Sequence, residues 1–138
     1  MLAEPEEALP SEVIGMKLHQ GRRTVYFFIG NAGQMVNVRQ PSFTANGKMI
    51  LVELEGESLQ KVFIDGEGEV AGENWVVQIT DGQLQMAQLQ TEWEITLSAD
   101  TEFRSTGLGT CLLKGDTRLA VGPELCLFLE AGKEYRMK

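Results

Sequence analysis

A period-two alternation of apolar and polar residues, broken at short intervals by glycine, asparagine and aspartate, constrains this chain more than any other feature. Residues 92–97 (EWEITL) show it clearly, since Trp93, Ile95 and Leu97 alternate with polar side chains. Fifteen glycines against four prolines are typical of many tight turns, and we expect turns at 21–23, 56–58 and 65–68. No amphipathic helical stretch accompanies this alternation, so the sequence predicts an all-β protein.

This pattern predicts about 10 short strands. The arrangement we expect is an antiparallel β-sandwich of jelly-roll-like form, with a closed barrel as the alternative. A length of 138 residues favours one domain. We expect residues 1–10, acidic and with prolines at both 5 and 10, to form a flexible N-terminal arm, and residues 11–138 to form the single β-sandwich domain.

Two dipeptides predict hairpins, because Asn-Gly and Asp-Gly favour the positive φ angles of two-residue turns. The first is Asn46-Gly47 and the second is Asp81-Gly82. At the second turn, the predicted register sets Ile79 opposite Leu84 on an apolar face and leaves a glutamine-rich polar face on the other side.

Two other segments carry further predictions. Residues 24–29 (TVYFFI) are apolar on both faces, which is typical of a central strand buried on both sides. Residues 110–137 read as a meander with turns at 115–116, 122–123 and 131–132. In that meander Cys111 and Cys126 would flank one strand about 10 Å apart, too far for a disulfide, and their apolar surroundings predict buried inert thiols.

The charge balance argues against several partners. The formal net charge is −8, whereas nucleic acids and anionic membrane surfaces require a basic protein surface. No run approaches the ~20 apolar residues of a membrane-spanning helix, and residues 1–10 do not read as a secretory signal. We therefore expect no nucleic acid and no membrane. The compartment stays unknown, with a cytoplasmic or virion-associated setting favoured over a secreted one.

Catalytic chemistry has little support in the sequence. The single histidine, His19, has no nucleophile near it, and no phosphate-binding loop, nucleophile elbow or zinc motif is present. Carboxylates alternate along two predicted strands, at Glu92 and Glu94 and at Glu53 and Glu55, as they do on most solvated sheet faces. We expect no enzyme and no cofactor, and keep a small carboxylate-dependent enzyme as the third alternative.

Two weak binding sites can be read from the residues. Asp65, Glu67 and Glu69 could hold calcium through their oxygen atoms. The ligand or interface candidates combine aromatic and amide side chains, as sugar recognition does; they are Trp75, Trp93, Gln78, Gln83 and Gln85. The alternation, however, sets both tryptophans on apolar faces and predicts that they belong to the core.

These observations predict a non-enzymatic structural or interaction module, a subunit of a homo- or hetero-assembly. Self-association or a protein partner would use the polar glutamine face and the long sheet edges. The alternative is a carbohydrate-binding accessory module of a larger enzyme, in which a tryptophan stacks on sugar.

Overall fold

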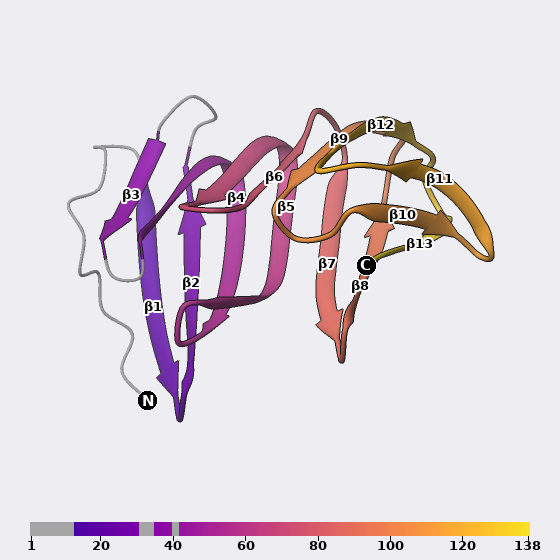
Figure 1. Ribbon diagram of the computed structural model, residues 1–138. Helices are drawn as coiled ribbons and strands as arrows, with labels where there is room; N and C mark the ends of the chain where they lie inside the picture. The colour runs from indigo at the N-terminus through magenta and orange to yellow at the C-terminus, as the bar shows by residue number, and fades with distance from the viewer. Residues whose placement is uncertain (1–12, 31–34, 40–41) are drawn as a thin grey trace.

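The computed structural model of this protein describes residues 13–30, 35–39 and 42–138 (Figure 1). Strands take up 75% of these residues and no helix occurs among them, which confirms the all-β prediction. The described part of the chain thus holds no helix long and apolar enough to cross a membrane. The arm predicted at residues 1–10 lies outside the described residues.

Thirteen antiparallel strands form the described sheet. They are β1 (Ile14–Gln20), β2 (Arg23–Ile29), β3 (Met35–Arg39), β4 (Ser42–Glu55), β5 (Ser58–Gly72), β6 (Val76–Ile79), β7 (Gln83–Leu89), β8 (Glu92–Leu97), β9 (Thr101–Thr106), β10 (Cys111–Lys114), β11 (Thr117–Val121), β12 (Glu124–Leu129) and β13 (Glu134–Met137).

The sheet divides into two branches because β4 and β5 are long enough to serve both. The first branch has the order β1, β2, β4, β5, β7, β8, β13, β10, β11. The second has the order β3, β4, β5, β6, β9, β12, and it uses the first part of β4 and the last part of β5. Figure 1 shows β4 and β5 curving from one branch into the other.

The chain segments that cross from one branch to the other, here called passages, lie side by side along one border of the sheet. After the bends in β4 and β5 come the β6–β7, β8–β9 and β12–β13 connections, in the order in which these strands are paired. Hydrogen bonds join neighbouring passages: Gly66 N–H donates to the Gly82 carbonyl at 2.7 Å, and Ala131 N–H donates to Asp100 Oδ1 at 2.8 Å. The passages are therefore a continuous hydrogen-bonded border rather than separate loops.

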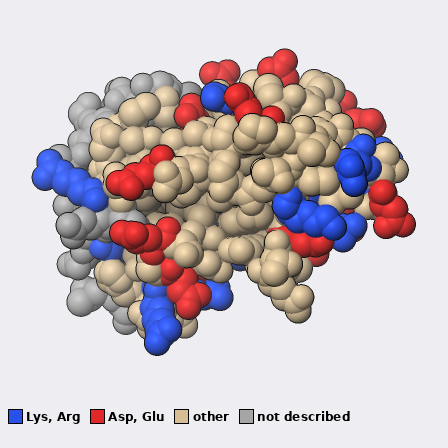
Figure 2. Space-filling view, viewed as in Figure 1, with Lys and Arg blue, Asp and Glu red and all other residues tan. Residues whose placement is uncertain are grey.

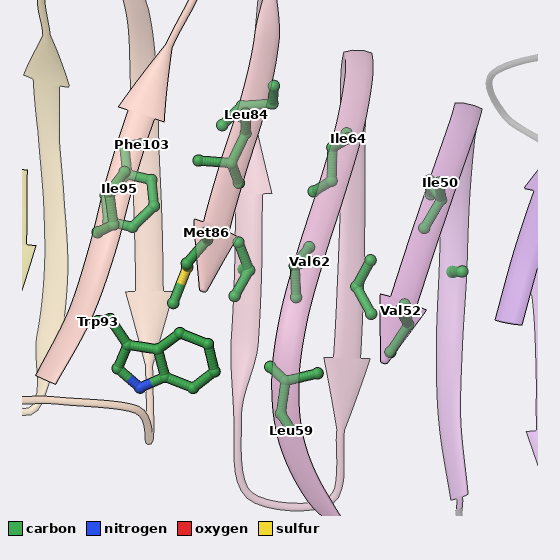
Figure 3. Packing of buried hydrophobic residues seen from close by; sticks show 14 of the residues in the cluster. Ile50, Val52, Leu59, Val62, Ile64, Leu84, Met86, Trp93, Ile95 and Phe103 are labelled. Atoms are coloured by element: carbon green, nitrogen blue, oxygen red, sulfur yellow. The ribbon is translucent and has the colours of Figure 1, made fainter. Parts of the chain in front are cut away.

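A single hydrophobic cluster takes its side chains from the inner faces of both branches. Val62, Ile64, Leu84 and Met86 belong to the first branch, and Phe103 belongs to the second; none of them is exposed. Figure 3 shows such side chains projecting into the space between the strands. Apolar burial of this kind is the main force that holds a β-fold together.

The sheet is not closed, so the described strands do not form the closed barrel that was the alternative. The prediction of about 10 short strands did not include two long ones. Thirteen strands are present among the described residues, and two of them, β4 with 14 residues and β5 with 15, are long. The turns predicted at 21–23, 56–58 and 115–116 are two-residue hairpin connections, one residue shorter than expected in the first two cases.

The hairpin predicted at Asn46-Gly47 is wrong, because β4 continues through this dipeptide without a break. Gly47 lies opposite Gly68 of β5, and a Cβ on Gly68 would come within 2.7 Å of the Ile64 side chain and 2.9 Å of the Asn46 carbonyl. Glycine is thus needed here for close approach of two bending strands. The turn predicted at 65–68 is likewise a β-bulge inside β5, with Gly66 and Glu67 opposite Lys48 alone.

The hairpin predicted at Asp81-Gly82 is also wrong in its pairing. β6 pairs with β5 and β9, whereas β7 pairs with β5 and β8, so the chain passes from one branch to the other between them. The predicted faces hold nevertheless: Ile79 and Leu84 are both fully buried. An arch between two branches of the sheet satisfies the same alternation as a hairpin within one branch, so the pattern could not distinguish them.

Strand β2 is not the central strand that its sequence predicts, and its outer face is not buried. It lies second from the edge, and Ile29 is 40% exposed. The meander ends after β10 and β11, since β12 pairs with β9 and β13 lies between β8 and β10. The cysteines are consequently not the buried thiols expected: Cys111 is half-buried and Cys126 exposed, and both are free.

Candidate functional site

The glutamines predicted to share one polar face lie on opposite sides of the molecule. Gln78 points outward from the second branch, between Glu69 and Arg104 in the register. Gln83 and Gln85 point outward from the first branch. The arch between β6 and β7 causes this separation, so no single surface contains all three side chains.

The two tryptophans also have different surroundings. Trp93 is 4% exposed and belongs to the core, as predicted. Trp75 packs on the same cluster but is only half-buried, and its indole lies against the backbone of Gly72. Beside it is a small hollow of about 110 Å³ at the ends of β4 and β5, lined by Ser42, Glu57, Glu73, Asn74 and Trp75.

Of the calcium candidates, Asp65 comes directly before the bulge in β5, Glu67 lies in it and Glu69 follows it. Within the described ranges of the chain, no three His, Cys, Asp or Glu side chains come together in a way that could hold a metal ion. The structure therefore does not bring these three carboxylates into one site.

Two of the carboxylates weighed as catalytic groups form ion pairs. Glu92 accepts a hydrogen bond from Arg136 at 3.2 Å, with Lys138 3.9 Å away. Glu53 accepts one from Arg23 at 3.0 Å. Glu53 and Glu94 are separated by β5 and β7, about 14 Å at the usual strand spacing. That separation exceeds the ~5–9.5 Å of glycosidase carboxylate pairs.

A different surface stands out once the strands are assembled. Tyr26, Val52 and Val62 pair across β2, β4 and β5 and are buried, so their sequence neighbours point outward. Most of these outward side chains are apolar, as are the ones on β1 that pair with them, while the charged side chains on the same side are Arg23, Glu53, Glu55, Lys61 and Asp65. We call the apolar members the apolar outer face: Ile14, Met16, Leu18, Val25, Phe27, Ile29, Met49, Leu51 and Phe63.

The exposure of this face is large for apolar residues. Ile14 is 70% exposed and Met16 is 43% exposed, and the remaining members except Ile29 are half-buried. Scattered exposed apolar residues are ordinary, but a contiguous apolar patch on a soluble domain marks an interaction surface. Figure 2, which shows one side of the molecule, has a broad uncharged area in the middle with acidic and basic side chains around it.

A shallow groove of about 460 Å³ adjoins the apolar outer face over β5, β7 and β8. Leu51 and Phe63 lie in both, and Lys61, Gln85 and Glu94 add polar groups around them. Gln85, one of the predicted ligand residues, thus lies directly opposite the aromatic ring of Phe63.

Phe63 and Leu51 were not predicted as site residues, because each sits in a strand with apolar residues on both faces. In KMILVEL and LQKVFI the outward apolar residues look like additional core. Only the cross-strand register shows that Phe27, Leu51 and Phe63 are direct neighbours on the solvent side.

No model of a known protein family matches this chain, and no curated protein matches it either. The properties of the site therefore rest on its own geometry.

Proposed function

We propose that the two branches are the layers of a β-sandwich, and that this sandwich is a non-enzymatic interaction module that associates with a second copy of itself. The observation that carries the proposal is the apolar outer face of β1, β2, β4 and β5. Its nine side chains are similar in character to the inner faces of the same strands, which already contribute to the hydrophobic cluster. Burying such a face away from water lowers the free energy of the system.

The area of the face agrees with this occupant. Four strands about 4.8 Å apart, with three same-face positions about 6.8 Å apart, span roughly 19 by 20 Å. This area holds the nine apolar residues and the charged Glu53, Lys61 and Asp65 at its border. The adjoining groove over β7 and β8 extends the surface to roughly 600 Å² before side-chain relief is added. A stable interface buries about 800 Å² per partner, so a second copy that covers the face and groove reaches that range.

The charges bordering the face suit a contact between identical surfaces. Lys61 lies in register between Glu53 and Ala87, with Glu94 beyond, so one row carries both signs. A two-fold contact uses the same patch on both copies, and mixed signs let each lysine approach a carboxylate of the other copy. The net charge of −8 opposes association at long range, and salt screens that repulsion.

The test is the solution mass by light scattering over a range of protein and salt concentrations. We expect a dimer of about twice 15.3 kDa, with a dissociation constant that falls as salt is raised from 0.05 to about 0.5 M. A monomer at every concentration contradicts the proposal. A monomer that floats with neutral phosphatidylcholine vesicles would assign the apolar outer face to a lipid surface instead.

The hollow beside Trp75 favours a second candidate function, carbohydrate binding. An indole with carboxylate, amide and hydroxyl groups around it supplies a stacking surface and acceptors for sugar hydroxyl groups. Acrylamide quenching of a Trp93→Phe variant reports on Trp75 alone. Quenching that decreases with added oligosaccharide supports this function, and quenching that stays unchanged across a glycan panel counts against it.

A further inference from the structure

The open edge of the first branch beside the apolar outer face is strand β1, which pairs with β2 alone among the described strands. A second copy could therefore associate in two ways. It could add its own strand to the β1 edge, or it could lie on the outer face without any backbone pairing. The two arrangements bury different side chains, so the residues of β1 can discriminate between them.

Lys17 is the informative residue of β1. It pairs with Tyr26 on the inner face, is 7% exposed, and holds its Nζ 5.4 Å from the centre of the Tyr26 ring. A charged side chain that points inward from an edge strand is a device by which natural sheets resist edge-to-edge pairing.

The outward side of the same strand has the opposite character. Ile14 and Met16 are exposed and continue, across Ile29 and Phe27, into the apolar outer face. The edge of β1 thus carries a buried charge where strand addition would occur, and an apolar surface where a second sheet would pack.

We infer that two copies meet face to face across a two-fold axis, sheet on sheet, and that the β1 edge stays outside the contact. This inference rests on the proposed self-association and specifies its geometry. The two outer faces pack about 10 Å apart, as sheets do within a sandwich. Phe63 and Leu51, where the apolar outer face meets the groove, lie near the middle of the contact.

Phe63 separates the two arrangements because β2 and β4 lie between it and β1, about 14 Å of sheet. Under face-to-face packing, Phe63→Lys raises the dimer dissociation constant about 100-fold or more, since both copies lose a central anchor. The matched control is Phe128→Lys, which adds the same charge at an exposed phenylalanine on the outward side of β12 and leaves the constant within about threefold.

The second variant is Lys17→Val, which removes the inward charge from β1. Face-to-face packing predicts a dissociation constant within about threefold of the parent, whereas edge addition predicts tighter association. Circular dichroism and urea unfolding check that each variant folds. Met49→Lys, at an outward position of the neighbouring strand β4, repeats the test if Phe63→Lys does not fold.

The outcomes separate the inference from the proposal beneath it. A dimer that Phe63→Lys disrupts and Lys17→Val leaves unchanged supports face-to-face packing. A dimer that survives Phe63→Lys and tightens with Lys17→Val overturns the inference but keeps self-association. A parent chain that stays monomeric overturns both.

Discussion

Asn46-Gly47 and Asp81-Gly82 carry the same local signal and have different structures. At the first, β4 continues and bends beside β5, with Gly47 facing Gly68. At the second, the chain leaves one branch for the other, and Gly82 has a φ of +71°. Neither is a hairpin. An Asx-Gly pair therefore marks a change in the direction of the chain, while the plane of that change depends on which strands lie on either side.

The largest expected effect concerns the bend. Gly68→Ala places a Cβ against the Asn46 carbonyl, which is backbone and cannot move aside, so we expect a loss of about 3 kcal/mol in unfolding free energy. Gly47→Ala meets the flexible end of Ile50 and should cost about 1 kcal/mol. Urea unfolding measures both, and equal losses would show that close approach at Gly68 does not shape the bend.

Substitution of Gly82 in the β6–β7 arch should lower the unfolding free energy through both the backbone angle and a steric contact. Gly82→Ala combines a left-handed φ with a Cβ only 2.6 Å from that of Ala99, and we expect a loss of about 2–3 kcal/mol. Gly21→Ala has a similar φ and open space, so it should cost about 1 kcal/mol.

A double variant isolates the contact between the two arches. Adding Ala99→Gly to Gly82→Ala should recover part of the loss, since it removes the opposing methyl group. Strictly additive unfolding free energies would mean that the β6–β7 and β8–β9 passages do not press on each other.

Loss of the side-chain hydrogen bonds that hold the β6–β7 arch should have the next largest effect on stability. Thr101 is buried, and its Oγ1 accepts from the N–H groups of Thr80 and Asp81 at 3.0 and 2.9 Å. Thr101→Val keeps the shape and removes the acceptor, so we expect a loss of about 2 kcal/mol. The outward Thr96→Val should change stability by less than about 0.5 kcal/mol. Similar values for the two valine variants would argue against side-chain support of this arch.

The smallest effect concerns the aspartate itself. Asp81 Oδ1 accepts from the Gly82 N–H at 2.8 Å in an exposed turn. We expect Asp81→Ala to cost about 0.5–1 kcal/mol, and Asp81→Asn, which keeps an acceptor, to cost less. Thermal unfolding of the pair checks this order, and a larger loss in the asparagine variant would reverse our view of the turn.

Local patterns predicted the all-β class and the buried sides of several strands. Trp93, Ile95 and Leu97 are buried as the alternation in EWEITL requires. The turn at 115–116 connects β10 and β11 as a hairpin. These features depend on residues close in sequence, where side-chain direction follows directly from the strand period.

The candidate site was much less accessible to sequence analysis. Gln78 and Gln85 were expected on one surface and lie on opposite ones, while Phe63 was not singled out at all. A period of two tells which residues share a side of one strand. It does not tell which strand lies next to it, and a surface is made by neighbouring strands.

Local sequence pattern was thus sufficient to predict the all-β class and the buried sides of strands such as β7 and β8, but not the bounds of β4 and β5 or the exposed side of β2. Three features became visible only once the strands were assembled: how β4 and β5 join the two branches, that Asp81-Gly82 crosses between them, and that Phe27, Leu51 and Phe63 form one apolar surface. Alternation is a local property of the backbone. Strand partners, in contrast, are chosen by contacts between residues far apart in the chain.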